Sequence, residues 1–137
     1  MGALHQGMMR SFREYMLVGG MPQVVQAFVN GKDFGKADFV KQQIITLYKN
    51  DMQEQNEENS VYVRNFFDRI PSELSKHDKR YVLSHIDSSA RIRNYQGPIR
   101  WLDEAMIVNL VSKVDDPSAA FNLGVIDPVF KCYLSDT

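Results

Sequence analysis

Three arginines in the second half of the chain have the side chains best suited to binding an anion. Arg91, Arg93 and Arg100 lie close together in the sequence and are interleaved with the aromatic residues Tyr95 and Trp101. Guanidinium groups neutralise phosphates, and a winged-helix domain can place one helix in a groove of DNA while such side chains contact the backbone. Arg91, Arg93 and Arg100 are therefore the candidate nucleic-acid contacts of this sequence.

Two further features favour a different use of the same region. Asp103 and Glu104 follow on the helix that carries Arg100, and their negative charge opposes the approach of DNA. The whole chain has 16 Lys and Arg against 17 Asp and Glu, so it lacks the general attraction for polyanions that most nucleic-acid binders show. A winged helix that packs against neighbouring domains is the favoured interpretation, and DNA binding is the alternative.

Motifs for nucleotide binding and covalent catalysis are missing from the sequence. Gly31-Lys32 and Gly35-Lys36 lack the spacing of a phosphate-binding loop and the Ser or Thr that follows its lysine. We interpret both pairs as parts of a solvated loop between helices. Cys132, which lies between Phe130 and Tyr133 in an apolar run, is expected to be a small buried side chain and not an activated thiolate. No catalytic residue is assigned.

The histidines do not form a metal-binding pattern. His5, His77 and His85 are far apart, and none has an acidic or Cys partner at a spacing typical of metal ligands. The sequence therefore predicts no metal site, and it contains no residue that we assign to a cofactor.

The first half of the chain has the apolar spacing of three helices. Apolar residues at spacings of four and three predict a helix over residues 8–17, and Pro22 suits the first turn of a second helix over 22–29. Between them, Gly19-Gly20 indicates either a residue with positive φ or a close approach of two helices. A longer stripe over residues 40–52 predicts a third helix of about five turns. We expect a helical hairpin followed by a long helix.

Another helix should follow a polar connection at residues 53–59. Asn59 or Ser60 is the expected cap, and Pro71 should end this helix or turn it into a short following one. The next segment, residues 81–83, is a short β-prone run.

The last third of the sequence has the order of a winged-helix domain. A helix capped by Asp87 or Ser88 should end in a turn at Gln96-Gly97, and Pro98 should start the next helix. Apolar, β-branched residues over 107–114 and a second apolar run over 129–134 predict a β-hairpin, with the polar residues 115–118 between them. The predicted fold is therefore mainly α: a helical hairpin and a long helix, then a winged-helix-like unit with a small β-hairpin.

Composition is typical of a folded globular domain, with 44% hydrophobic and 24% charged residues among 137. Cys132 is the only cysteine, so an internal disulfide is excluded and a reducing compartment fits. No apolar run approaches the ~20 residues that span a bilayer, and the first residues lack the pattern of a signal peptide. We expect a cytoplasmic protein with no membrane partner.

Several short runs, taken in order, resemble one known family. They are FREYMLVGGMP at residues 12–22, YKND at 48–51, IPSEL at 70–74, AR at 90–91, WL at 101–102 and FKCYLSDT at 130–137. Together they resemble prokaryotic AAA-type P-loop ATPases that carry a C-terminal domain of unknown function 4143, which is predicted in that family to have a nuclease-like fold. Gln23, where the family often has an acid, and Cys132, where Leu is usual, depart from the family pattern.

The resemblance implies a position within a larger protein. In the family, the ATPase core precedes the Gly-Gly-Met-Pro turn and the nuclease-like domain follows the Asp-Thr that closes this sequence. Residues 1–56 would then be a helical lid-like segment and residues 57–137 a winged-helix-like segment between the two. ATP and Mg are implied for the parent protein and not for this fragment.

Three hypotheses of function follow. The favoured one is a non-catalytic coupling module that links the nucleotide domain of an AAA-type ATPase to the nuclease-like domain of the same chain, with self-association as a further option. The alternative is a DNA-binding winged helix that uses Arg91, Arg93 and Arg100. The third is a contribution to ATP hydrolysis in the full-length protein, in which Arg13 or Arg91 stabilises charge on the transferred phosphate.

Overall fold

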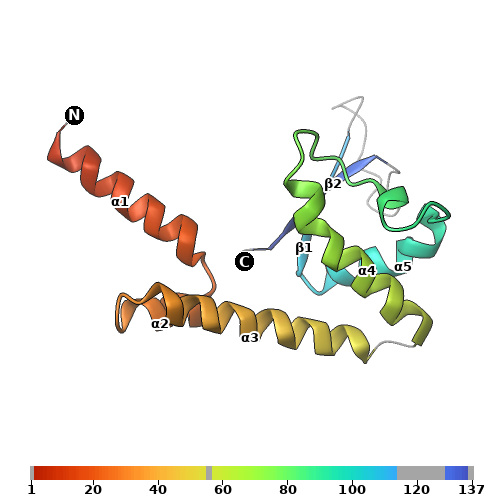
Figure 1. Ribbon diagram of the computed structural model, residues 1–137, viewed down its shortest axis with the longest axis horizontal. Helices are drawn as coiled ribbons and strands as arrows, with labels where there is room; N and C mark the ends of the chain where they lie inside the picture. The colour runs from red at the N-terminus through yellow and green to blue at the C-terminus, as the bar shows by residue number, and fades with distance from the viewer. Residues whose placement is uncertain (1, 55–56, 114–128, 136–137) are drawn as a thin grey trace. The chain divides into compact units, whose positions relative to one another are not determined.

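The computed structural model describes residues 2–54, 57–113 and 129–135, which form two compact units (Figure 1). One unit extends to Asn50, and the other comprises Asp51–Ser135. The described residues include five α-helices and a two-stranded antiparallel sheet, which confirms the predicted mainly α fold with a small β-hairpin. Among these helices, none combines the length and the apolar character that crossing a membrane requires.

The first unit is built from helices α1 (Ala3–Val18), α2 (Pro22–Val29) and the greater part of α3 (Phe34–Gln53). Gly19 joins α1 to α2 with a φ of 79°, which confirms that this turn needs a positive φ. Its amide donates a hydrogen bond to the Tyr15 carbonyl and so closes the end of α1. The predicted second helix has the observed bounds, whereas the first begins earlier than residue 8.

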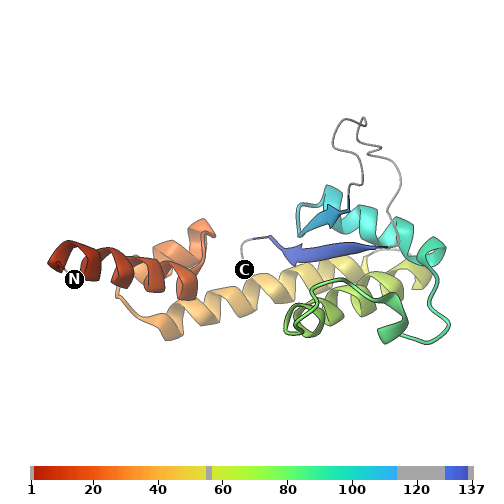
Figure 2. The ribbon, with the colours of Figure 1, turned by 90° about the horizontal axis from the view of Figure 1, so that it is seen from above.

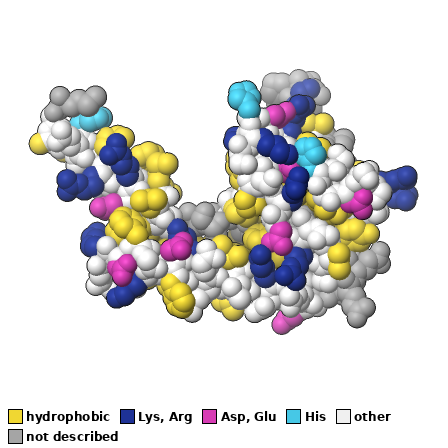
Figure 3. All heavy atoms as spheres, viewed as in Figure 1, with side chains coloured by type: hydrophobic (Ala, Val, Ile, Leu, Met, Phe, Trp, Pro, Cys, Tyr) yellow, Lys and Arg dark blue, Asp and Glu magenta, His cyan; other side chains and the backbone are white. Residues whose placement is uncertain are grey.

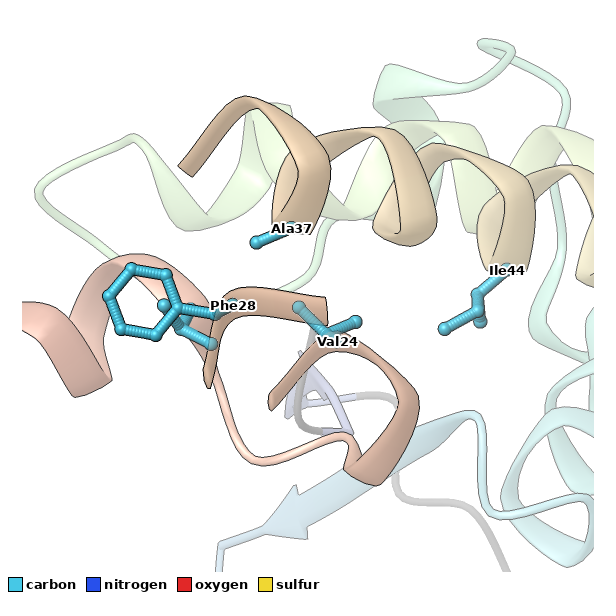
Figure 4. Close-up of a cluster of buried hydrophobic side chains, with 5 residues drawn as sticks. Val24, Phe28, Ala37 and Ile44 are labelled. Atoms are coloured by element: carbon cyan, nitrogen blue, oxygen red, sulfur yellow. The ribbon is translucent and has the colours of Figure 1, made fainter. Parts of the chain in front are cut away.

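The core of the first unit lies between α2 and α3. In Figure 4, Val24 and Phe28 on α2 face Ala37 and Ile44 on α3, and all four side chains are buried. Val18 is the one described residue of α1 that joins this cluster. The hairpin and the long helix therefore share a core to which α1 contributes only its end.

The second unit contains α4 (Glu57–Leu74), a short 3₁₀ helix η1 (Leu83–His85), α5 (Ile92–Glu104), β1 (Val108–Ser112) and β2 (Phe130–Leu134). The strands pair antiparallel, with Val108 opposite Leu134 and Ser112 opposite Phe130. α4 packs against α5 and β2, and α5 also packs against β1 (Figure 2). A helical part followed by a small hairpin is the order that the sequence predicts, but the two helices predicted directly before the hairpin are one helix, α5. Residues 114–118, predicted as the end of a strand and a polar turn, lie outside the described residues.

The predicted turn at Gln96-Gly97 is wrong, because α5 runs without a break through both residues and through Pro98. Its buried residues, Tyr95, Pro98, Ile99 and Leu102, recur at spacings of three, one and three, and only a continuous helix places them on one face. Burial of this face outweighs the backbone hydrogen bond that proline removes.

Other predicted helix limits are also wrong. α4 continues through Pro71 to Leu74, and it begins at Glu57, ahead of the expected caps Asn59 and Ser60. Asp87 does not cap α5; its carboxylate accepts a hydrogen bond from the Ser89 amide, which makes a local turn. Local sequence preferences locate the ends of a helix only to within a few residues, and tertiary contacts decide where the helix begins and ends.

Aromatic rings form the core of the second unit. Phe66 on α4 stacks on Tyr81 with ring centroids 4.3 Å apart, and Phe130 on β2 stacks on Tyr81 at 5.6 Å. The Tyr81 hydroxyl donates a hydrogen bond of 2.7 Å to the Phe66 carbonyl, and burial raises the pKa of this hydroxyl far above its usual range. The β-prone run at 81–83 forms no strand: Arg80, just before it, makes an isolated β-bridge with Lys131, the Tyr81 amide donates a hydrogen bond to the Phe130 carbonyl, and η1 begins at Leu83.

Cys132 lies in the same core, on β2. Its side chain is buried, which confirms the predicted structural role, and burial raises the pKa of the thiol to about 12. A thiol with such a pKa is almost entirely protonated at neutral pH, so it is a poor nucleophile.

Candidate functional site

The three arginines predicted to contact nucleic acid lie at and along α5. Arg91 precedes the helix in an extended conformation, whereas Arg93 and Arg100 lie on the helix, seven residues apart, and all three are exposed. A spacing of seven residues is two turns, or about 10 Å, on one face of a helix. That face lies opposite the buried face with Ile99, so the structure presents Arg93 and Arg100 together and places Arg91 at the helix start.

The exposed face of α5 also carries acid. Glu104 lies four residues after Arg100, at the distance of neighbouring side chains on a helix, and both Asp103 and Glu104 are exposed. The opposing charge predicted from the sequence is therefore present beside Arg100. Arg13, the other arginine considered for catalysis, is exposed on α1.

The loop with the two Gly-Lys pairs caps a helix. The Asp33 carboxylate accepts hydrogen bonds from the amides of Gly35, at 2.8 Å, and Lys36, at 3.3 Å, at the start of α3. A phosphate-binding loop would direct such amides at its ligand. A shallow hollow of about 510 Å³ lies beside this loop and includes Gly31, Gly35 and Lys36 in its lining. The geometry agrees with the interpretation of a solvated loop between helices.

An exposed apolar face runs along α1. Leu4, Met8, Phe12 and Tyr15 recur at spacings of four, four and three, and each side chain is at least half exposed. Met16 extends this face and is 67% exposed. We call these five residues the α1 apolar face; in Figure 3 hydrophobic side chains follow this helix.

Among the described residues, the polar contacts between α1 and the rest of its unit lie near the C-terminal end of the helix. Lys41 on α3 donates a hydrogen bond of 2.7 Å to the Leu17 carbonyl, and Lys32 pairs with Glu14 at 4.0 Å. With Val18 in the core, these contacts hold one end of the helix. The α1 apolar face is left uncovered by the described residues.

The buried carboxylate of Glu73 is a functional candidate that the sequence analysis missed. Glu73 is 1% exposed, and it continues the apolar stripe of α4 that includes Val63, Phe66 and Ile70. A carboxylate is rarely buried without partners. Its position on an apolar stripe was the signal available in the sequence, but the stripe alone does not identify the partners.

Three basic side chains surround this carboxylate. Oε1 of Glu73 lies 2.7 Å from Nζ of Lys76, 2.9 Å from Nδ1 of His85 and 3.3 Å from Nε of Arg69. Burial by itself raises the pKa of Glu73, but the hydrogen bonds from Lys76 and His85 and their charges outweigh it, so the pKa is lowered. We call Arg69, Glu73, Lys76 and His85 the Glu73 cluster.

The other histidines do not join this cluster. His5 and His77 are exposed on α1 and after α4, respectively. Among the described residues, no group of three or more His, Cys, Asp and Glu side chains could hold a metal ion.

Comparison with models of protein families gives a match over most of the chain. The model of a family described as "Domain of unknown function (DUF8612)" matches residues 9–137. No curated protein and no solved structure matches the chain.

Proposed function

We propose that this chain, which belongs to the DUF8612 family of domains of unknown function, is a non-catalytic coupling module of a larger AAA-type ATPase. Its task would be to link the nucleotide domain to a C-terminal nuclease-like domain of the same protein. ATP and Mg would bind to the parent protein. The observation that carries the proposal is the α1 apolar face, because a contiguous exposed apolar surface on a domain commonly marks a site that binds another surface.

The composition of α1 supports a role in binding protein. Met8 and Met16 lie on its apolar face, and methionine side chains adapt their shape to irregular partner surfaces. Phe12 and Tyr15 lie between them and provide large contact areas. An amphipathic helix with anchors at these spacings commonly binds in an apolar groove.

The resemblance to AAA-type ATPases suggests what covers this helix. The run at residues 12–22 that carries the resemblance includes the second half of α1 and the Gly19 turn. In that family the nucleotide domain precedes this run, so it is the nearest surface available in the chain. The second unit would then contact the nuclease-like domain.

Photo-crosslinking in the full-length parent protein tests this proposal. A photoreactive phenylalanine analogue replaces Phe12 on the α1 apolar face, and the matched control carries it at Val29, which is similarly exposed on α2. We expect position 12 to crosslink to the nucleotide domain and position 29 to crosslink far less. Crosslinks from position 12 that never reach the nucleotide domain would contradict the proposal.

DNA binding is the second candidate, supported by the shared exposed face of Arg93 and Arg100 on α5. Fluorescence anisotropy with a labelled duplex at low salt tests it. Replacing Arg91, Arg93 and Arg100 by Ala should reduce affinity and the dependence of affinity on salt. The absence of any binding at low salt would exclude this function.

A further inference from the structure

We propose that Arg69, Lys76 and His85 form a binding site for a phosphate group and that the buried carboxylate of Glu73 holds them in place. The site lies in the second unit, at the end of α4 and beside η1. It is separate from α5, which carries Arg93 and Arg100. This inference does not depend on the proposed coupling function.

The first argument is the balance of charge. Three basic nitrogens lie within 3.3 Å of a single oxygen, Oε1 of Glu73. Arg69 and Lys76 carry two positive charges against one carboxylate, and protonation of His85 would add a third. Glu73 neutralises one of these charges, so the Glu73 cluster keeps a net positive charge that can attract an anion.

The second argument is which groups reach solvent. The side chains of Arg69, Lys76 and His85 are 39%, 37% and 40% exposed, whereas that of Glu73 is 2% exposed. An anion that approaches from solvent therefore meets the cations and is shielded from the carboxylate. Arg69 contacts Glu73 through Nε, and a guanidinium group can bind phosphate oxygens through a pair of N–H groups.

The third argument concerns the proton on Nδ1 of His85. This nitrogen lies 2.9 Å from Oε1 of Glu73 and 2.7 Å from Nζ of Lys76. It cannot donate a proton to the carboxylate and at the same time accept one from the ammonium group. One of the two contacts therefore lacks a hydrogen bond. When Nδ1 donates to Glu73, it cannot accept an N–H bond from Lys76, and a phosphate oxygen near Lys76 would accept that bond instead.

Pre-organisation is the fourth argument. Lys and Arg side chains lose rotamer freedom when they are ordered, and contact with Glu73 orders Arg69 and Lys76 before any ligand arrives. Other nearby cations have different partners, because Lys79 donates to the Leu74 carbonyl and Arg80 pairs with Asp78. The Glu73 cluster is thus distinguished from the remaining basic side chains of this region. Figure 3 shows Lys, Arg and His side chains gathered over this part of the second unit.

Titration of the 137-residue chain followed by NMR tests the site. Inorganic phosphate is added at constant ionic strength, with chloride as the control anion, and signals of the Arg69 Nε–H group and the His85 ring are recorded. We expect saturable shifts with phosphate and none with chloride. A short DNA duplex forms a second arm: saturation by phosphate indicates a free or terminal phosphate as the source, and saturation by the duplex alone indicates a nucleic-acid backbone.

Paired variants distinguish binding at this site from a general effect of positive charge on the protein surface. Arg69→Gln and Lys76→Gln should each weaken binding about tenfold, the usual effect of losing one charge-assisted contact. Arg64→Gln is the matched control, since Arg64 lies on the same helix in an exposed pair with Asp68 at 3.9 Å, and it should leave affinity unchanged. The proposal is overturned if wild type shows no saturable shift with either phosphate probe, or if Arg64→Gln weakens binding as much as Lys76→Gln.

Discussion

Helices α1 and α4 have similar apolar stripes and opposite surroundings. On α1, Leu4, Met8 and Phe12 are exposed, whereas on α4 the side chains of Phe66 and Ile70 at the same four-residue spacing are completely buried. α4 is covered by α5 and β2 within its own unit, whereas among the described residues α1 is held near its C-terminal end. The comparison shows that an apolar stripe on a helix does not by itself determine whether that stripe is buried.

Replacing the same residue type in the two helices should give the largest contrast. Phe66→Ala removes a ring that is 0% exposed and should destabilise the second unit by about 3–5 kcal/mol, because it leaves a cavity in the aromatic core. Phe12→Ala, on the 52% exposed ring, should change stability by less than about 0.5 kcal/mol. Chemical denaturation followed by Trp101 fluorescence measures the second unit, and amide exchange measures the first. Equal losses would show that α1 is covered after all.

The two glutamates of these regions should also differ. Glu73→Gln removes a buried charge from three basic neighbours, and we expect a loss of about 2–3 kcal/mol in the second unit. Glu14→Gln removes an exposed partner of Lys32 on α1 and should have almost no effect. Urea denaturation of both variants makes the comparison. A neutral Glu73→Gln would mean that the Glu73 cluster contributes nothing net to folding.

Two glycines should respond with opposite signs. Gly19, between α1 and α2, has a φ of 79°, so Gly19→Ala should destabilise the first unit by about 1–2 kcal/mol. Gly7 lies inside α1, where an added methyl group meets nothing within 4 Å, so Gly7→Ala should stabilise this helix by about 0.5–1 kcal/mol. Amide exchange in α2 and α1 measures the two effects. A stabilising Gly19→Ala would contradict the assigned turn.

Acidification should produce the smallest of the four predicted changes in stability. The pKa of Glu73 is lower in the folded chain than its ordinary value of 4.5, so its contribution to stability is present above that pH and is lost as pH falls through the folded value. Stability of the second unit should therefore decline on acidification below about pH 4.5. The stability of Glu73→Gln should decline less than that of wild type over this range. Identical pH profiles for wild type and Glu73→Gln would show that Glu73 is not the group responsible.

Helix content and the hairpin were predictable because they follow from local spacing. Pro22 at the start of α2 and the apolar stripe of α3 needed no knowledge of distant residues, and the β-branched residues of β1 indicated a strand directly. The error at Gln96-Gly97 has a tertiary cause. Local signals favoured a turn there, but the buried face of α5 required a continuous helix.

The candidate sites also differ in whether local sequence or tertiary contacts reveal them. Arg91, Arg93 and Arg100 were identified from residue type alone, and the structure adds that two of them share one face of α5. The Glu73 cluster escaped the sequence analysis because His85 contacts a carboxylate 12 residues earlier in the chain, across two elements. Contacts of this kind have no local periodicity.

The sequence by itself determined which side chains share a helix face, where the hairpin forms and which cations are available. Tertiary structure alone decided that the described residues cover the apolar face of α4 and not that of α1, and that a buried Glu73 contacts Arg69, Lys76 and His85. The physical reason is that periodicity depends on neighbouring residues, whereas burial and ion pairing depend on which distant segments meet.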